Sequence, residues 1–224
     1  MIPHAIDVTG AHRSFGTVRA ISDISLSATE GERILLLGHN GSGKSTLLAI
    51  CSGVLRCTSG SAMIAGASPR HSKVTGYAGH TPMIYSALTA RENLEIFAAF
   101  SCVKPSSVDA SLVHWGLADV ADRPSQTLSK GLQARLSLAR ATIHSPAVLL
   151  LDEPTASLDD AGASLLSTYI LSRTDMACII ATHDIARLRP VATRIVVLES
   201  GAVIADSARS SLDEAIVIYR ERNR

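Results

Sequence analysis

The residues best suited to chemistry form one short glycine-rich stretch, 38–46, which reads G-H-N-G-S-G-K-S-T. It matches the pattern G-x-x-x-x-G-K-[ST], in which glycines let successive backbone N–H groups turn inward around phosphate oxygens. Lys44 can then reach the β- and γ-phosphates of a nucleotide, and the Ser45 hydroxyl can hold Mg²⁺. The cofactor-binding candidates of this loop are Gly38, His39, Asn40, Gly41, Ser42, Gly43, Lys44, Ser45 and Thr46.

Two acidic residues at the end of an apolar run supply the second chemical group. Residues 147–151 are apolar and lead into Asp152 and Glu153, as in a buried parallel strand whose carboxyl end meets a ligand. Asp152 is placed to bind Mg²⁺, and Glu153 to act as general base for an attacking water. A second apolar run, 178–181, is followed by Thr182 and His183. His183 could bond a γ-phosphate or be structural.

These groups require a strand, a loop and a helix in that order. Residues 34–37 are apolar and predict a buried strand, and residues 46–50 predict a helix that stops near Gly53. This is the context that the glycine-rich motif needs, because the N-terminus of the helix adds positive partial charge to the phosphate site. A glycine-rich turn that matched the motif by chance would lack this strand and this helix.

Two shorter segments predict a separate antiparallel unit near the N-terminus. Residues 5–9 and 24–28 alternate apolar and polar side chains, which is typical of half-exposed strands joined here through residues 12–16. Phe15 would lie in that connection. Its position leaves two roles open: stacking on a nucleobase, or filling a small core beneath the loop.

A helical region separates the two halves of the predicted sheet. Apolar residues recur at helical spacing from 86 to about 121, with a break at Pro105. Trp115 is predicted to pack inside this region. A polar turn then opens another helix, for which Ser129 can serve as the N-cap. The pattern predicts a helical insertion within a nucleotide-binding core.

Composition excludes several classes of protein. The net charge is only +1, so there is no overall attraction to nucleic acid. No apolar run reaches the roughly 18 residues that a membrane-spanning helix needs, and the N-terminal residues lack the pattern of a signal peptide. The four cysteines form no C-x-x-C pair, which indicates reduced, buried thiols in a cytosolic protein.

In this order the motifs resemble those of the nucleotide-binding domain of ABC transporters, over about residues 6 to 205. The resemblance implies an α/β fold: a P-loop NTPase core of mostly parallel sheet, with an antiparallel β-subdomain and a helical insertion. It implies a single ABC ATP-binding domain over residues 1–224, with a helical subdomain at about 82–140. It also implies ATP and Mg²⁺ as cofactors.

Individual residues can be carried over from the family one by one. Phe15 matches the aromatic residue that stacks on adenine, which favours that role. Residues 128–132, L-S-K-G-L, match the signature motif usually written LSGGQ, and residues 157–159 match the D-loop. The matched catalytic residues are Glu153, His183 and Lys44, and the matched metal ligands are Ser45 and Asp152.

The sequence departs from the family pattern in two places. Lys130 and Leu132 replace glycine and glutamine of the signature, whereas Ser129 and Gly131, which would meet a γ-phosphate, are kept. His80 stands where the family has a glutamine that contacts Mg²⁺ and water. An imidazole is a poorer Mg²⁺ partner than an amide oxygen. His80 would therefore act through a water, or as a mechanical link to the membrane subunit.

The resemblance also implies partners. One P-loop and one signature per chain imply a head-to-tail homodimer around two ATP molecules, bound to integral membrane transporter subunits. The location would be cytoplasmic, peripheral on the inner face of the cell membrane, with no nucleic acid partner. The loop 79–82 and the stretch 88–94 are similar to the ATP-binding subunit of the haem exporter of cytochrome c maturation. The alternatives are another exporter ATPase, a soluble ABC protein, and a module that binds nucleotide without hydrolysing it.

Overall fold

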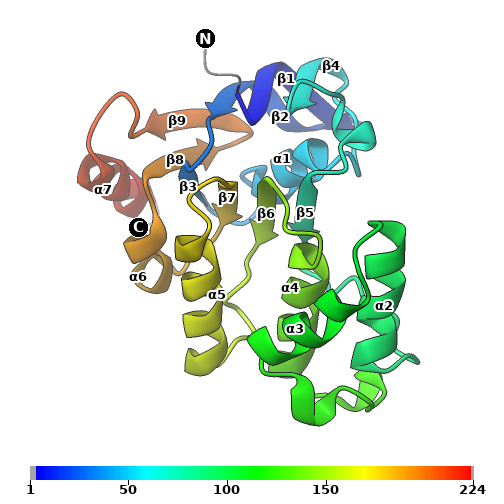
Figure 1. The fold of residues 1–224 in the computed structure, drawn as a ribbon. Helices are drawn as coiled ribbons and strands as arrows, with labels where there is room; N and C mark the ends of the chain where they lie inside the picture. Colours follow the sequence, from blue (N-terminus) through cyan, green and yellow to red (C-terminus); the bar gives the residue numbers. More distant parts are fainter. Residues whose placement is uncertain (1–3, 223–224) are drawn as a thin grey trace.

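The computed structural model describes residues 4–222, which form two β-sheets with helices around them (Figure 1). The strands are β1 (Ile6–Phe15), β2 (Val18–Ala28), β3 (Arg33–Leu37), β4 (Ser59–Ile64), β5 (Thr75–Ala78), β6 (Val148–Asp152), β7 (Ala177–Ala181), β8 (Arg194–Glu199) and β9 (Ala202–Asp206). The helices are α1 (Lys44–Cys51), α2 (Ala90–Phe100), α3 (Ser106–His114), α4 (Lys130–Thr142), α5 (Asp160–Ser172), α6 (Ile185–Leu188) and α7 (Leu212–Arg222).

The larger sheet has the strand order β5-β6-β7-β3-β8-β9. Its pairs are parallel except for the hairpin of β8 and β9. The smaller sheet, β2-β1-β4, is antiparallel throughout. This arrangement confirms the predicted α/β fold of mostly parallel sheet with an antiparallel unit. Helices α2, α3 and α4 lie between β5 and β6 in the chain, where the helical insertion was expected.

Register brings three strand ends together at one edge of the larger sheet. Ala181, the last residue of β7, pairs with Leu36 of β3 on one side and with Asp152 of β6 on the other. Strands β3, β6 and β7 are almost wholly buried, because both faces of this part of the sheet are covered. The glycine-rich loop after β3 and the acids at the end of β6 therefore emerge at the same end of the sheet, with β7 between them.

The side chains of each central strand alternate between two cores. Ile34 and Leu36 pack on the side of α1 and the three-stranded sheet, whereas Leu35 and Leu37 pack on the opposite side with helices α4, α5 and α7. In Figure 1 the three-stranded sheet lies at the top beside α1, and α2 and α3 lie away from it. Successive side chains of a strand point to opposite faces of the sheet. Both faces are buried here, so the run 34–37 has no polar face.

The predicted bounds of the first hairpin were wrong. Residues 12–15 belong to β1 and are not a connection, and β2 starts at Val18, so Phe15 ends a strand next to a tight turn. The pairing of β1 with β2 shifts register after Val8, after Ala11 and after Arg13. Bulges of this kind interrupt the inside–outside alternation on which a sequence-based strand assignment depends.

The helical region largely follows its prediction. Pro105 precedes α3, Trp115 is buried, and the Ser129 side chain caps α4 by accepting a hydrogen bond from the Leu132 amide at 3.3 Å. Helix α5 was not predicted. Asp159 caps it through the Gly162 amide at 2.9 Å, so an aspartate before a partly apolar run was the signal that could have found it.

One buried cation connects this region to the sheet. The Arg140 guanidinium, on α4, donates to the Tyr77 carbonyl of β5 and lies 5.1 Å from the centre of the Phe97 ring on α2. Burial lowers the pKa of Arg140 to about 10. The arginine thus joins the helix that starts at the signature-like stretch to the strand that leads into His80.

A buried amide organises the start of the helical region. The Asn93 side chain is fully buried. Its Oδ1 accepts from the Tyr85 amide at 2.7 Å, and its Nδ2 donates to the Tyr85 carbonyl at 3.0 Å and the Ser125 hydroxyl at 3.0 Å.

We expect Asn93→Leu to lower the free energy of unfolding by about 3 kcal/mol, because several buried polar groups lose their partner. Denaturant unfolding checks this. Gln126→Leu, at an exposed amide, is the control, and an equally stable Asn93→Leu variant would contradict the assignment.

No helix within residues 4–222 combines the length and the apolar character that crossing a bilayer demands.

All four cysteines are free thiols. Cys51 and Cys178 are buried, and burial raises the pKa of Cys51 to about 12. Cys57 is only half-buried and Cys102 is exposed, which corrects the expectation that all four would be buried.

Candidate nucleotide site

A cleft of about 430 Å³ lies where the strand ends meet the tip of the first hairpin. Its walls come from the β1–β2 turn, the glycine-rich loop, the loop after β5 and the end of β6. The residues that line it are Phe15, Val18, Arg19, Ala20, Asn40, Gly41, Gly43, Lys44, Ser45, Thr46, His80, Asp152 and Glu153. Most of the predicted site residues are therefore on the wall of one cavity.

The glycine-rich loop has a backbone that side chains would prevent. Gly43 has φ 104° and caps α1, and a Cβ there would lie 2.6 Å from the Ala20 carbonyl oxygen. Gly38 has φ 151°, and a Cβ there would collide with the Leu198 carbonyl and the Ser42 hydroxyl. These two positions require glycine for close approach as well as for φ.

Lys44 folds back over this loop. Its side chain is largely buried, with the residue 7% exposed, and its ammonium donates to the carbonyls of Gly38 at 2.6 Å and His39 at 2.9 Å. Burial lowers the pKa of Lys44, and the nearby negative charges of Glu153 and Asp152 act in the opposite direction. The ammonium is thus held within the loop by neutral acceptors that a phosphate group could replace.

Asp152 is the most buried acid of the cleft, at 4% exposed. Burial raises its pKa, while the Ser45 hydroxyl stabilises the carboxylate and the charge of Glu153 adds to the rise. Within residues 4–222 it forms no ion pair within 4.0 Å. A buried carboxylate beside a hydroxyl supplies two hard oxygen donors, so these two residues fit Mg²⁺.

Glu153 is held differently from its neighbour. Its φ of 51° is unusual for a residue with a side chain. Oε2 of Glu153 lies 2.9 Å from Nδ1 of His183 and accepts a hydrogen bond from the His183 amide at 3.3 Å. The structure therefore brings these two predicted catalytic residues into contact, although His183 does not line the cleft.

Phe15 stands at the opposite end of the cleft, 45% exposed. The Arg13 guanidinium lies 4.6 Å from the centre of its ring and donates to the Arg56 carbonyl at 3.1 Å. Sequence reasoning missed Arg13, because a bulge after Arg13 interrupts the alternation that would relate it to Phe15. The arginine orients the ring, and the exposed part of the ring remains free to stack on a base.

Ser129 and Gly131 do not line this cleft. They lie at the start of α4, and the Ser129 hydroxyl is used as the helix cap. Among the loop residues, Gly38, His39 and Ser42 also lie off the cleft wall. The first two serve as acceptors for Lys44, and the buried Ser42 hydroxyl has no hydrogen-bond partner within the described chain.

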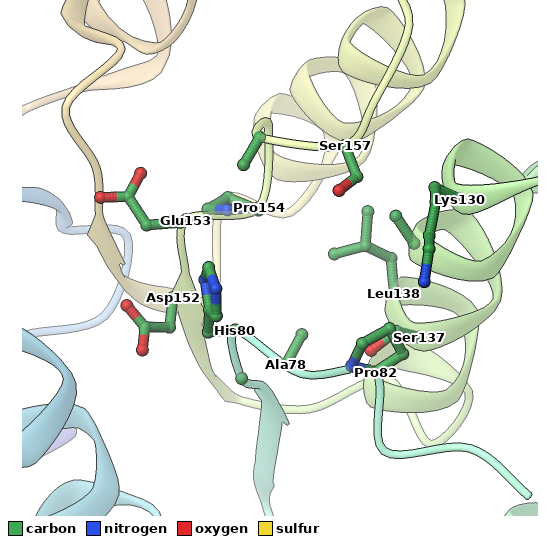
Figure 2. Close-up of a pocket in the computed structure, with 13 residues that line it drawn as sticks. Ala78, His80, Pro82, Lys130, Ser137, Leu138, Asp152, Glu153, Pro154 and Ser157 are labelled. Carbon is green, nitrogen blue, oxygen red and sulfur yellow. The ribbon is translucent and has the colours of Figure 1, made fainter.

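His80 lies on the wall beside Asp152 and Glu153. Figure 2 shows its imidazole close to the end of β6, with the carboxylates of Asp152 and Glu153 pointing away from α4. The cleft thus combines an aromatic ring, a glycine-rich loop with a lysine, a pair of oxygen donors that fit Mg²⁺, and a positioned carboxylate. This set can bind a nucleoside triphosphate and activate water against its last phosphate.

Comparison with known proteins supports the same reading. Residues 21–156 match the family described as "ABC transporter". The chain is 32% identical to the cobalt import ATP-binding protein CbiO of Rhodobacter capsulatus, over 88% of this chain and 76% of that protein. It is 31% identical to the phosphonates import ATP-binding protein PhnC of Halobacterium salinarum, over 92% and 80% of the two chains. A dimeric ATP-binding cassette in a post-hydrolysis state, bound to ADP and Pi, has a TM-score of 0.81 at 25% identity, over 90% and 97%.

Proposed function

This chain belongs to the ABC transporter family as an ATP-binding and ATP-hydrolysing subunit, and we propose how its residues perform that reaction. The observation that carries the proposal is the shared edge of β3, β6 and β7, where Lys44, Asp152 and Glu153 meet in one cleft. In that cleft the adenine of ATP stacks on Phe15. Its phosphates lie in the glycine-rich loop, against the N-terminus of α1.

Lys44 and the metal pair neutralise the phosphate charges. On ATP binding, the Lys44 ammonium exchanges the Gly38 and His39 carbonyls for β- and γ-phosphate oxygens, which are stronger, charged acceptors. Ser45 and Asp152 would hold Mg²⁺, which would supply positive charge to offset that of the phosphate oxygens. His80 acts through a water or as a mechanical link to the membrane subunit.

Glu153 is the general base. It accepts a proton from the water that attacks the γ-phosphorus in line, as the bond from phosphorus to the β–γ bridging oxygen breaks. His183 orients the carboxylate through the contacts at 2.9 Å and 3.3 Å. It also approaches the γ-phosphate and stabilises its charge in the transition state.

Two copies of the chain close on two ATP molecules in our proposal. Ser129 and Gly131 are absent from the wall of the cleft in their own chain, which leaves them available to a nucleotide held by a second copy. The similar cassette bound to ADP and Pi is described as dimeric. Ser129 and Gly131 of one copy would complete the phosphate site around Lys44 of the other, and closure would exclude water.

We propose that closure of the two copies on ATP moves integral membrane subunits bound to them. We propose one ABC ATP-binding domain over residues 1–224, whose helical subdomain, about 82–140, moves with the nucleotide. The groove near His80 to Leu94 would accept a helix of an integral membrane partner, since Met83 and Tyr85 expose apolar surface there. The chain would then act on the inner, cytoplasmic face of the cell membrane, and its near-neutral net charge gives nucleic acid no role.

For the transported cargo we propose export, with haem for cytochrome c maturation as the substrate. The support is the loop Gly79-His80-Thr81-Pro82 together with the stretch 88–94. Relatives are described as cobalt importers, phosphonate importers and lantibiotic transporters, so the ATPase core serves many cargoes. An exporter of another cargo is the alternative, and a soluble ABC ATPase is a further one.

Capture of partners from membranes tests this proposal. Tagged Glu153→Gln protein with ATP should retain integral membrane subunits, and Lys44→Ala protein is the matched bait that cannot hold ATP. Co-recovery of cytochrome c assembly proteins would support haem export. Recovery of other permeases would keep the transporter and discard haem, whereas recovery of soluble partners alone would contradict the transporter proposal.

The role of Phe15 gives a separate prediction. Phe15→Ala should raise the KM for ATP about 10-fold with little change in kcat, because stacking of a base on an aromatic ring contributes roughly 1–3 kcal/mol and does not act on the γ-phosphate. Phe15→Tyr should retain the wild-type KM. Phe100→Ala removes an exposed phenylalanine far from the cleft and serves as the control. A normal KM in Phe15→Ala would eliminate the stacking role.

A further inference from the structure

A second cavity lies on the other side of His80, Asp152 and Glu153. It has a volume of about 280 Å³, and these three residues line both it and the nucleotide cleft. Its remaining walls come from the loop after β5, the face of α4, and Ala156 and Ser157 at the start of the D-loop. Figure 2 shows this cavity between the end of β6 and α4. The two cavities therefore share one wall, which faces the γ-phosphate end of the cleft.

The far wall of this second cavity has unused hydrogen-bonding capacity. The Ser137 residue is 4% exposed, and its hydroxyl has no hydrogen-bond partner within the described chain. A buried hydroxyl without a partner costs about 1–3 kcal/mol, so its presence on a cavity wall indicates that something else satisfies it. Figure 2 shows Ser137 at this wall, below Lys130 on the same helix.

Lys130 supplies a positive charge to the same wall. Its side chain extends along α4 toward Ser137 (Figure 2), and this exposed residue forms part of the cavity wall. Between residues 4 and 222 no carboxylate lies within 4.0 Å of it.

The negative groups of the cavity face elsewhere. The carboxylates of Asp152 and Glu153 point away from Lys130 and Ser137 (Figure 2), and Oε2 of Glu153 is held by His183. The wall thus combines a lysine at the exposed side with the hydroxyls of Ser137 and Ser157, a set that suits a small oxyanion. A phosphate ion released at the shared wall would be repelled by the two acids and attracted by Lys130.

We propose that this second cavity binds the inorganic phosphate produced by hydrolysis, with Lys130 and Ser137 as its ligands. The inference rests on the proposed role of the cleft in ATP hydrolysis. In this proposal the shared wall of His80, Asp152 and Glu153 separates the phosphate from ADP, and the phosphate leaves beside α4. No bond forms or breaks in the second cavity.

Equilibrium binding of inorganic phosphate tests the proposal without turnover. The protein is first saturated with ADP and Mg²⁺, which fills the glycine-rich loop, and is then titrated with phosphate in a calorimeter. If ADP does not bind, the proposed nucleotide site has failed, and that failure is visible before phosphate is added. Lys130→Met should raise the Kd for phosphate at least ~10-fold, and Lys130→Arg should restore much of the affinity.

Ser137→Ala tests the second proposed phosphate ligand. It should raise the Kd for phosphate roughly threefold or more without lowering Tm, because removing an unpaired buried hydroxyl costs no internal hydrogen bond. Lys104→Met, at an exposed lysine before α3, is the matched control and should bind phosphate normally. Wild-type phosphate affinity in both Lys130→Met and Ser137→Ala would overturn the proposal and leave the glycine-rich loop as the phosphate site. A large fall in Tm for Ser137→Ala would also overturn it, since the hydroxyl would then be structural.

Discussion

Glu153→Gln is expected to lower the turnover of ATP at least ~10²-fold, because the amide cannot accept the proton of the attacking water. The substitution keeps the size of the side chain, and its amide oxygen can still accept the hydrogen bond from the His183 amide. Affinity for ATP should therefore stay within about twofold of the wild type. Steady-state phosphate release gives kcat, and equilibrium titration with a fluorescent nucleotide gives the Kd.

The same change at an uninvolved site is the control for this prediction. Glu30 is exposed in the turn before β3, and Glu30→Gln should hydrolyse ATP at the wild-type rate. If Glu153→Gln also hydrolyses ATP normally, Glu153 is not the base. If it loses both turnover and nucleotide affinity, its contacts with His183 serve to build the site rather than to carry the proton.

Lys44→Ala is expected to raise the Kd for ATP at least ~10²-fold. The ammonium lies inside the loop on the Gly38 and His39 carbonyls, where a triphosphate would offer it charged acceptors worth several kcal/mol. Little else in the loop can replace this charge, because the remaining donors are backbone N–H groups. Both direct titration and the rise of Tm with added ATP should report the loss.

Lys73→Ala removes an exposed lysine just before β5 and is the matched control, with unchanged affinity expected. Lys44→Ala also frees two carbonyls, so its Tm without nucleotide is measured first. A folded Lys44→Ala protein that binds ATP as tightly as the wild type would remove the glycine-rich loop from the proposed site.

Much of the chemistry could be predicted from short stretches of sequence. The glycine-rich loop, the acids after β6 and the histidine after β7 each follow an apolar run, and a parallel sheet brings such strand ends to one edge. The class of fold followed from the same runs. Local signals suffice to predict these features, because buried parallel strands and helix caps are determined by neighbouring residues.

Other features depended on contacts between residues far apart in the chain. The bulges of β1, which extend the strand to Phe15, arise from pairing with β2 and β4. Arg13 against Phe15, Arg140 against the Tyr77 carbonyl and Asn93 against Ser125 are likewise invisible in any local pattern. Helix α5 escaped prediction since its residues alternate apolar and small polar types without a clear stripe.

The sequence by itself thus determined which groups could handle a nucleoside triphosphate, because the motif residues are adjacent in the chain and their spacing sets the local backbone. Only the tertiary structure decided how these groups lie toward one another. It joined Glu153 to His183, kept Ser129 and Gly131 off the wall of their own cleft, and placed Lys130 and Ser137 on a second cavity. The reason is physical: side-chain direction and cavity shape follow from packing between elements, which no short stretch of residues encodes.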